Sequence, residues 1–297
     1  MKRVSIVIAT YGRHEVLVET LQHLLALEPP ADEVLVVDQT PEHPNEVRER
    51  LRVWNDEGRI RWLRRAEPSI PGAMNDGLVA ATGEVVLFVD DDIVPVTDLV
   101  RWHAESFTEP SIVAVAGQVL QPGERPESLE GAAFGFRSTI PQEVSEVMGG
   151  NFSIRRKEAI RAGGFDENFV KAAYRFEAEF CGRLCSSGGR IRFVPRASLR
   201  HLRAESGGTR AYGEHLRTWR PSHSVGEYYF LLLPSQRRSR WKGILTRPGR
   251  ALRTRHHFRR PWWVPVTIAA EAGGLVWAVV LRWKGPRLLG TSRGASR

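Results

Sequence analysis

The stretch Glu84–Pro95, "EVVLFVDDDIVP", decides the fold that this sequence predicts. Residues 85–89 are all Val, Leu or Phe, which is the pattern of a strand buried on both faces. Three adjacent carboxylates, Asp90, Asp91 and Asp92, follow this strand directly. Their mutual repulsion raises their pKa values unless a cation compensates. We therefore expect positive charge at this point, and hard oxygen ligands of this kind suit Mg²⁺ or Mn²⁺.

Strands alternate with helices through the first half of the chain. "VSIVIAT" (Val4–Thr10) and "EVLVVD" (Glu33–Asp38) predict two more buried strands. We expect shorter strands at 60–63 and 112–117, and helices at 14–27, 72–81 and 97–107. This alternation predicts an α/β fold with a Rossmann-like, mostly parallel sheet and helices on both faces. Ligands of such sheets bind beyond the carboxyl ends of the strands, where Thr10, Asp38 and the acidic triplet are expected to meet.

The usual phosphate-binding loops are missing from the sequence. There is no G-x-x-x-x-G-K-[ST] motif, and "TYGRHE" stands after the first strand in place of G-x-G-x-x-G. This disfavours P-loop kinases and ordinary dinucleotide dehydrogenases. A phosphorylated ligand in the crevice would need another source of positive charge, and a divalent cation held by the aspartates is the expected one.

The net charge of +9 conceals two differently charged regions. Residues 235–297 contain 15 Lys/Arg and one acid, Glu271, whereas residues 1–234 contain 28 basic and 33 acidic residues. The chain is therefore divided into a mildly acidic body, 1–234, and a basic helical C-terminal appendage, 235–297. The basic pI describes neither part and does not indicate nucleic-acid binding by the body. Two cysteines, Cys181 and Cys185, are too few for a disulfide framework or a zinc site.

Five segments in order resemble glycosyltransferase family two, with the GT-A fold. They are "VSIVIATYGRHEVLVETLQHLL", "EVLVVDQT", "PGAMNDGLVAATGEVVLFVDDDIVP", "GGNFSIRRKEAIRAGGFDENF" and "RFEAEFCGRL", and they extend from about residue 3 to residue 203. The resemblance implies a catalytic domain that binds a nucleotide-sugar donor and a divalent cation. It also implies transfer of the sugar with inversion at its anomeric carbon.

By this resemblance, the ends of the first two strands bind the nucleoside. Thr10 and Tyr11 leave the first strand where the nucleoside is expected, and Tyr11 would stack on or line the base. Asp38 would accept a hydrogen bond from a uracil-type imide N–H, which favours a UDP-type donor. Arg13 would approach the donor phosphates.

Two glycine-containing segments are expected beside the donor. In "PGAMNDG", Gly72 and Asn75 match the family, but Met74 stands where relatives often carry a phosphate-binding arginine. Some phosphate binding is therefore expected from elsewhere. In "MGGNFSIRR", Gly150 and Asn151 are expected beside the donor sugar, because glycine permits close backbone approach.

The resemblance also implies a set of metal ligands. Asp92 is the first choice as a direct ligand, and Asp90 would meet the metal or the ribose. Asp91 would contact the donor or cap the next turn, and His201 would be a further metal or pyrophosphate ligand. The glycine-containing loop that ends at Arg210 is expected to close over the donor, with Arg210 reaching a phosphate.

Inverting transfer requires a base that takes the proton of the acceptor hydroxyl. In the family, this is the second acid of a Glu-Asp pair that opens a helix. Aligning the Arg-Leu of "RFEAEFCGRL" places Glu177 at the base position and Phe176 where the first acid would be. Glu179 and Asp166 remain alternative bases.

The C-terminal region has the composition of a membrane-associating segment. Pro261–Leu281 is 21 residues long with Glu271 as its only charge, and basic residues flank it on both sides. Five of the nine tryptophans also lie within 235–297. We expect a helix on an anionic membrane surface, with a single span at 261–281 or a soluble helix packed on the body as alternatives. The expected location is cytoplasmic, peripheral at the inner face of the cell membrane.

The function predicted from these observations is metal-dependent inverting glycosyl transfer. The acceptor would be a glycan or lipid-linked glycan of cell-envelope or polysaccharide biosynthesis, and no nucleic-acid partner is expected. A sugar-nucleotide pyrophosphorylase is one alternative, although the chain has no Gly-rich Arg/Lys loop after its first strand. A catalytically silent sugar-binding scaffold is another, which the acidic triplet together with Glu177 argues against.

Overall fold

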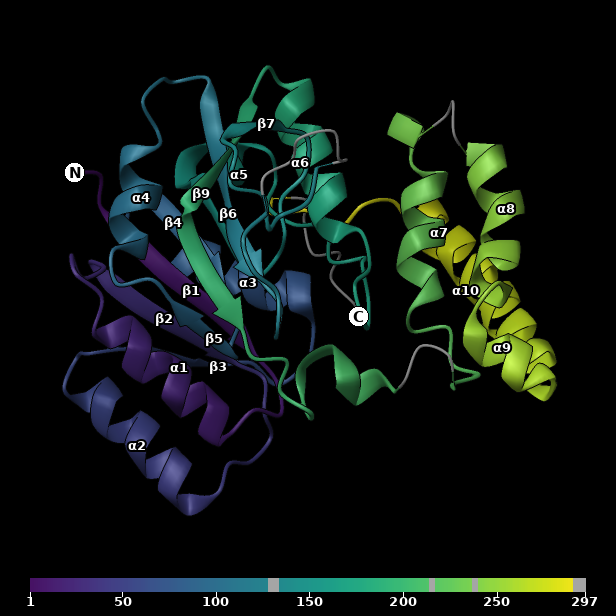
Figure 1. The fold of residues 1–297 in the computed structure, drawn as a ribbon, viewed down its shortest axis with the longest axis horizontal. Helices are drawn as coiled ribbons and strands as arrows, with labels where there is room; N and C mark the ends of the chain where they lie inside the picture. Colours follow the sequence, from purple (N-terminus) through teal and green to yellow (C-terminus); the bar gives the residue numbers. More distant parts are fainter. Residues whose placement is uncertain (128–133, 214–216, 237–239, 291–297) are drawn as a thin grey trace.

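The computed structural model describes residues 1–127, 134–213, 217–236 and 240–290. One nine-stranded mixed sheet forms its centre, in the order β3-β2-β1-β4-β8-β6-β9-β5, with β7 paired to β9. Helices lie on both faces of this sheet (Figure 1). The predicted α/β class is therefore confirmed.

Four strands form the parallel half of the sheet: β1 (Val4–Thr10), β2 (Glu33–Asp38), β3 (Arg61–Arg64) and β4 (Val85–Val89). Thr10 pairs in register with Asp38, and Ile8 pairs with Val89. These strands therefore end close to one level, and the residues that follow them gather at one edge of the sheet.

Two buried clusters hold helices to the two faces of the sheet. The first joins the sheet to α1 (Glu15–Leu25), α2 (Asn45–Asp56) and α4 (Leu99–Glu105). The second joins it to α3 (Ile70–Ala80), α5 (Arg156–Arg161) and α6 (Phe176–Ser186). In α1, the helical spacing of Leu17, Leu21 and Leu24 places all three against the sheet, where they are fully or almost fully buried. Burial of each such leucine contributes roughly 1.5–3 kcal/mol.

The remaining strands are β5 (Ile93–Pro95), β6 (Ile112–Leu120), β7 (Gln142–Val144), β8 (Asn151–Arg155) and β9 (Arg190–His201). The acidic triplet forms the turn between β4 and β5, and β5 pairs antiparallel with the end of β9. In this register Ile93 lies opposite His201. A histidine 109 positions from Asp92 in the chain is thus brought beside it.

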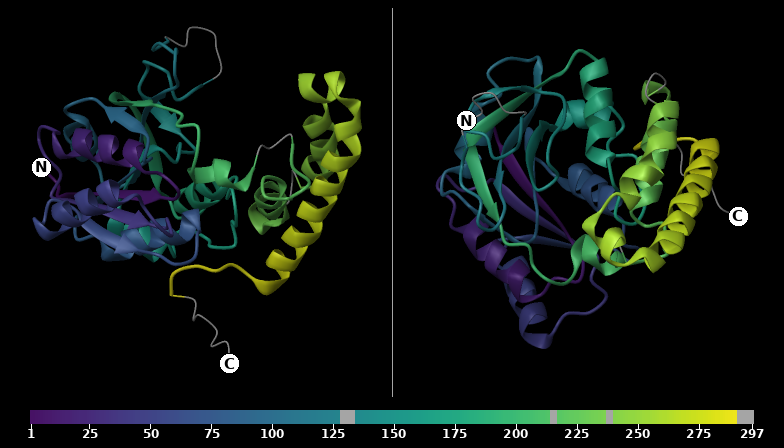
Figure 2. Two further views of the ribbon diagram at one scale, coloured as in Figure 1. Left: turned by 90° about the horizontal axis from the view of Figure 1, so that it is seen from below. Right: turned by 45° about the vertical axis from the view of Figure 1, so that its right-hand side comes forward.

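The C-terminal region is helical, as predicted. It contains α7 (Ser224–Leu232), α8 (Arg240–Leu252), α9 (Arg255–Arg259) and α10 (Val264–Lys284), with 3₁₀ turns η1 (Gly208–Tyr212), η2 (Pro234–Gln236) and η3 (Pro261–Trp263). Both views in Figure 2 place α10 outside α7, away from the sheet. The predicted boundary at residue 234 falls between α7 and α8, and residues 237–239 and 291–297 of the predicted appendage lie outside the described residues.

The segment after α10 returns to the body of the protein. The Leu289 N–H donates to the Gly163 carbonyl at 2.7 Å, and the Arg287 N–H donates to Asp166 at 2.9 Å. The Asn168 amide donates to the Gly285 carbonyl at 2.6 Å. The helices α7 to α10 are therefore attached to the body at both ends.

Among the described residues, Pro261–Lys284 is the one helical segment long and apolar enough to cross a membrane.

Candidate active site

The acidic triplet has an internal counter-charge in Arg13. The Arg13 guanidinium lies 3.2 Å from Asp91 and 3.4 Å from Asp92, and all three side chains are more than 90% buried. Asp91 also accepts a hydrogen bond from the Thr10 hydroxyl at 2.7 Å. Thr10 and Arg13, predicted to contact the donor, therefore hold the triplet in place. Arg13 in addition lines the cavity described below.

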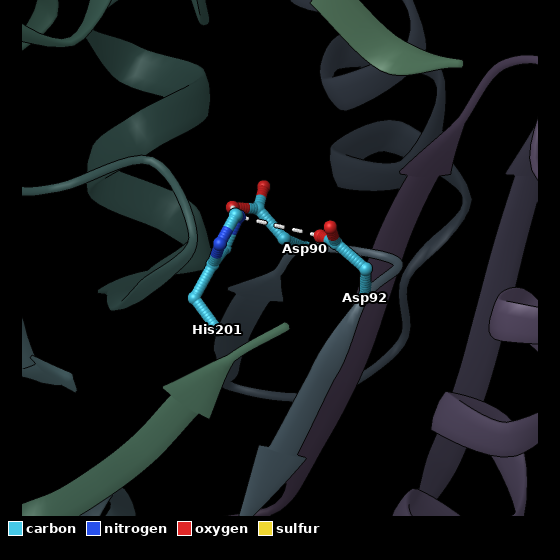
Figure 3. Close-up of side chains that lie close together, drawn as sticks. All are labelled: Asp90, Asp92 and His201. Atoms are coloured by element: carbon cyan, nitrogen blue, oxygen red, sulfur yellow. Dashed lines mark ion pairs between the residues drawn. The ribbon is translucent and has the colours of Figure 1, made fainter. Parts of the chain in front are cut away.

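Asp90, Asp92 and His201 form a cluster that can hold a metal ion. The His201 Nε2 atom lies 3.3 Å from Asp92 and 3.6 Å from Asp90. One ligand atom from each residue lies within 4.8 Å of the others, and the three side chains converge on one point (Figure 3). This is the ligand set predicted from the sequence.

The electrostatics of this cluster favour a cation. The Asp90 side chain keeps 46% of its surface exposed, and partial desolvation together with the neighbouring Asp92 raises the pKa of Asp90 to about 6, against the opposing effect of Arg13. Burial lowers the pKa of His201, which keeps the imidazole neutral and able to act as a ligand. Two carboxylates and one neutral imidazole are suitable ligands for Mn²⁺ or Mg²⁺, with further positions left for phosphate oxygens.

A cavity of about 600 Å³ lies beside the cluster. Its lining includes Tyr11 and Gln39, which follow β1 and β2, and Ser69 before α3. It also includes Tyr174 and Phe176 at the start of α6. The acidic triplet and His201 also line the cavity. The volume is in the range of small-molecule binding sites.

Glu177 lies in this cavity, at the start of α6. Burial, with a smaller effect from Asp90, raises the pKa of Glu177 to about 8. A carboxylate in this state gains from taking up a proton, as a general base requires. Glu177, predicted as the base, and the residues of the metal cluster therefore line the same cavity.

Two adjacent glycines allow these carboxylates to approach the main chain. A Cβ at Gly149 would lie 2.6 Å from the Glu177 Oε1 atom, and a Cβ at Gly150 would lie 2.3 Å from the Asp90 Oδ2 atom. Neither distance is acceptable for a real Cβ. Gly150 was predicted beside the donor sugar and does line the cavity, while the role of Gly149 beside Glu177 was missed.

The two alternative bases have structural partners. Glu179 forms an ion pair with Arg183 at 2.6 Å along the same helix. Asp166 accepts a hydrogen bond from the Tyr229 hydroxyl at 2.7 Å and from the main chain of Arg287. Neither residue lines the cavity, so the geometry favours Glu177 over both.

Asp38 differs from its predicted role. It is fully buried and does not line the cavity. Its carboxylate accepts hydrogen bonds from His43, Trp62 and Arg64 at 2.6–2.9 Å, and from the Thr40 N–H at 2.8 Å. Although burial alone would raise it, these hydrogen bonds lower the pKa of Asp38. Since protein groups already saturate the carboxylate, the structure does not bring it to a uracil N–H.

Four other predicted donor-binding residues also lie outside the cavity: Thr10, Gly72, Asn75 and Asn151. The Asn75 amide exchanges two 2.8 Å hydrogen bonds with the main chain of Phe165. Asn151 is fully buried and donates to the carbonyls of Gln118 and Ala197. A Cβ at Gly72 would collide with a nearby arginine side chain at 2.4 Å. Asn75 and Asn151 therefore join elements around the site, because a buried amide needs partners for all its polar atoms.

The loop before Glu177 was missed by the sequence analysis. Lys171, Ala173 and Arg175 all have positive φ values, of 61°, 51° and 73°. Such conformations are unfavourable for residues with a Cβ and cluster at functional sites. Packing from α7 supports the loop, since the Arg175 guanidinium stacks 4.9 Å from the centre of the Phe230 ring. No local sequence signal such as glycine marks these positions.

The loop after β9 also contributes residues to the cavity lining. Arg13 donates hydrogen bonds to the carbonyls of Ala204 and Ser206, and the Gly208 N–H donates to the Tyr11 carbonyl at 2.7 Å. Arg210 lines the cavity beyond this anchored segment. Arg210 therefore supplies a cationic group to a cavity in which Met74, at the position of the family's arginine, supplies none.

Comparison with known proteins gives a consistent assignment. Residues 5–164 match the family described as "Glycosyl transferase family 2". A pre-mycofactocin glycosyltransferase of Mycobacterium tuberculosis is 30% identical over 139 residues, which cover 43% of this chain but only 29% of the relative. A glucosyl-dolichyl phosphate glucuronosyltransferase of Haloferax volcanii is 27% identical over 225 residues, covering 67% of this chain and 69% of the relative.

Solved structures share the fold. The mannosyltransferase PcManGT from Pyrobaculum calidifontis, in complex with GDP-Man and Mn²⁺, aligns with a TM-score of 0.57 at 20% identity. That alignment covers 96% of this chain and 79% of the other. GalNAc-T7 with UDP, GalNAc and Mn²⁺ aligns with a TM-score of 0.57 at 14% identity, covering 68% of this chain and 44% of the other. The predicted GT-A fold is thereby confirmed.

Proposed function

Because this chain belongs to glycosyl transferase family 2, we propose that it moves a sugar from a nucleoside-diphosphate sugar to an acceptor hydroxyl, with inversion and with a divalent cation. The observation that supports this most directly is that Glu177 and the Asp90–Asp92–His201 cluster line the same cavity. The Mn²⁺ ions named with PcManGT and GalNAc-T7 agree with a metal-dependent reaction.

Asp90, Asp92 and His201 would hold the cation. Its chemistry there is to offset the negative charge that develops on the departing nucleoside diphosphate. These three residues fit a cation because, without one, the charge of Asp92 helps to raise the pKa of Asp90. A bound positive charge would therefore stabilise both carboxylates. Arg13 holds Asp92 in place through their ion pair, and Arg210 adds a cationic group to the cavity lining for the donor phosphates.

Glu177 acts as the general base. It takes the proton of the acceptor hydroxyl as that oxygen attacks the anomeric carbon. Its raised pKa of about 8 makes the ionised carboxylate a stronger base, and the carboxyl must first lose its own proton, so the fraction in the active form rises with pH up to about pH 8. Gly149 leaves room for the carboxylate, and the loop that ends at Arg175 sets where α6 begins.

The donor base is bound near Tyr11, Gln39 and Ser69, the part of the cavity nearest the ends of β1 and β2. The preference for UDP that was predicted from Asp38 has no support in the hydrogen bonding of that residue. UDP- and GDP-sugars are therefore equal candidates, and the solved relatives named above contain one nucleotide of each kind.

The acceptor that we propose is a lipid-linked glycan at a membrane surface, as part of cell-envelope or polysaccharide biosynthesis. The Haloferax relative, whose name refers to glucosyl-dolichyl phosphate, supports this class. The basic, apolar region from α8 to α10 supports membrane association of the chain.

The test is release of nucleoside diphosphate from a panel of UDP- and GDP-sugars, with Mn²⁺ or with EDTA. We expect turnover with at least one donor, abolished by EDTA. Glu177→Gln should lower kcat by about 100-fold or more and leave Mn²⁺ binding unchanged. Glu179→Gln is the matched control and should keep most of the activity, since Glu179 pairs with Arg183 outside the cavity. Full activity of Glu177→Gln, or turnover unaffected by EDTA, would contradict the proposal.

A further inference from the structure

The outward face of α10 has no polar side chain over five turns. Between Val264 and Leu281, its exposed residues are Pro265, Ile268, Ala269, Ala272, Gly273, Val276, Val279 and Val280. Val276 is 66% exposed and Val279 is 51% exposed. Helices that face water carry charged or polar residues on their outer face. This face is therefore built to contact something other than water.

The inward face of α10 is fixed to α7 and α8. Gly274 lies so close to Ser224 that a Cβ would be 2.1 Å from its hydroxyl. Glu271, the one charged residue within this apolar stretch, accepts a hydrogen bond from the Tyr228 hydroxyl at 2.8 Å and pairs with Arg247 at 3.0 Å. Since its charge is buried and neutralised on the inner side, Glu271 is no obstacle to an apolar environment on the outer side.

Cations surround the start of α10. Arg253, Arg255 and Arg259 line an open cavity of about 660 Å³ together with Phe258, which is 90% exposed. Within the described part of the chain, no carboxylate forms an ion pair with any of these three arginines. The cavity thus offers unneutralised guanidinium groups beside an exposed aromatic ring.

The end of α10 repeats this combination. Trp283 is 87% exposed and lies between Arg282 and Lys284. Trp262, just before α10, is 67% exposed. Tryptophan next to Lys/Arg at both ends of an apolar strip is the arrangement found where a helix meets lipid headgroups.

We propose that the outer face of α10 lies flat on an anionic membrane, with lipid phosphates bound in the cavity lined by Arg253, Arg255 and Arg259. The helix does not span the bilayer, because α7, α8 and the Glu271–Arg247 pair would have to enter the hydrocarbon with it. This inference rests on the proposed function in one respect: membrane binding would bring the cavity of the enzyme close to a lipid-linked acceptor.

The experiment is flotation of the full-length protein with vesicles of phosphatidylcholine alone or with 30% phosphatidylglycerol. We expect binding to the anionic vesicles, weakened by high salt and reversed by alkaline carbonate, which releases surface-bound proteins but not membrane-spanning ones. Each neutralised arginine, as in Arg255→Gln or Arg259→Gln, should weaken binding about fivefold.

A paired substitution tests the apolar strip. Val276→Asp with Val280→Asp should weaken vesicle binding by roughly tenfold or more per introduced charge. Both positions are exposed, so the variant should keep the thermal unfolding profile of the parent. Val79→Asp is the matched control, because Val79 is 54% exposed on α3 of the body, and it should bind vesicles normally.

Three results would overturn the inference. They are equal binding of the Val276→Asp/Val280→Asp variant, retention of the parent protein through carbonate extraction, and lipid-free self-association that the same variant abolishes. The last would show that a second copy of the chain covers this face. Vesicle binding needs no turnover, and nucleoside-diphosphate release from soluble donors needs no vesicles. Failure of either proposal is therefore seen separately from failure of the other.

Discussion

Substitution of the adjacent glycines Gly149 and Gly150 should separate metal binding from base catalysis. A Cβ at Gly150 would lie 2.3 Å from the Asp90 Oδ2 atom, and a Cβ at Gly149 would lie 2.6 Å from the Glu177 Oε1 atom. Ordinary contacts of this kind begin at 3.4 Å, so each carboxylate must move by roughly 1 Å. Both glycines have ordinary φ values, and alanine introduces no backbone strain at either position.

The two alanine variants should therefore fail in different ways. Gly150→Ala displaces a metal ligand and should raise the Kd for Mn²⁺ by about 10–100-fold, with a partial recovery of activity at high Mn²⁺. Gly149→Ala displaces the base and should lower kcat by about 100-fold with the Kd for Mn²⁺ unchanged. Calorimetric titration of Mn²⁺ in the presence of a nucleoside diphosphate gives the Kd, and nucleoside-diphosphate release gives kcat. If Gly150→Ala bound Mn²⁺ as the parent does, Asp90 would not be a ligand.

Three further predictions concern the charged groups around the site. The pKa of Asp90 is raised to about 6, so its proton must leave before a cation binds. The affinity for Mn²⁺ should therefore rise about tenfold per pH unit up to about pH 6 and then level off. A Kd for Mn²⁺ that calorimetry finds constant from pH 5 to pH 7 would contradict the role of Asp90 as a ligand. Arg13→Met leaves Asp91 and Asp92 buried without a counter-charge and should lower the free energy of unfolding by about 3 kcal/mol in urea titrations without metal, whereas an unchanged midpoint would show that the pairs are not formed. Asp38→Asn removes the charge that holds Arg64 and should cost about 2 kcal/mol of stability with little change in the donor KM, and a large rise in that KM would restore the nucleoside-binding role.

The sheet and the acidic part of the metal cluster could be predicted because both follow from short patterns. Continuous apolar runs locate the buried strands, and parallel strands necessarily bring their carboxyl ends to one edge. The triplet after β4 is therefore visible in the sequence once the strands are ordered, whereas His201 at the end of β9 was expected as a ligand only from the resemblance to the family. Glu177 required the resemblance to the family, since a glutamate near a helix start has no distinctive pattern by itself.

Other features depend on pairings between distant residues, which no local pattern encodes. Whether the carboxylate of Asp38 faces the cavity or the interior depends on His43, Trp62 and Arg64, and each is an unremarkable residue by itself. From the sequence, the Arg13 guanidinium could contact either a donor phosphate or the acidic triplet. The fold pairs it with Asp91 of the triplet. The same holds for Asn151, whose partners come from β6 and β9.

The attachment of residues 285–289 to the body limits how this chain can be divided. Shortening the polypeptide at the charge boundary near residue 234 would delete the basic region together with Gly285 and Arg287, which form hydrogen bonds with Asn168 and Asp166 of the body. It would also strip the covering from α7, whose Phe230 supports the strained loop before α6. The region that we assign to the lipid surface thus also supports the fold of the body. A form of the enzyme that does not bind membranes is therefore better obtained by substituting polar residues on the exposed face of α10 than by deleting the helix.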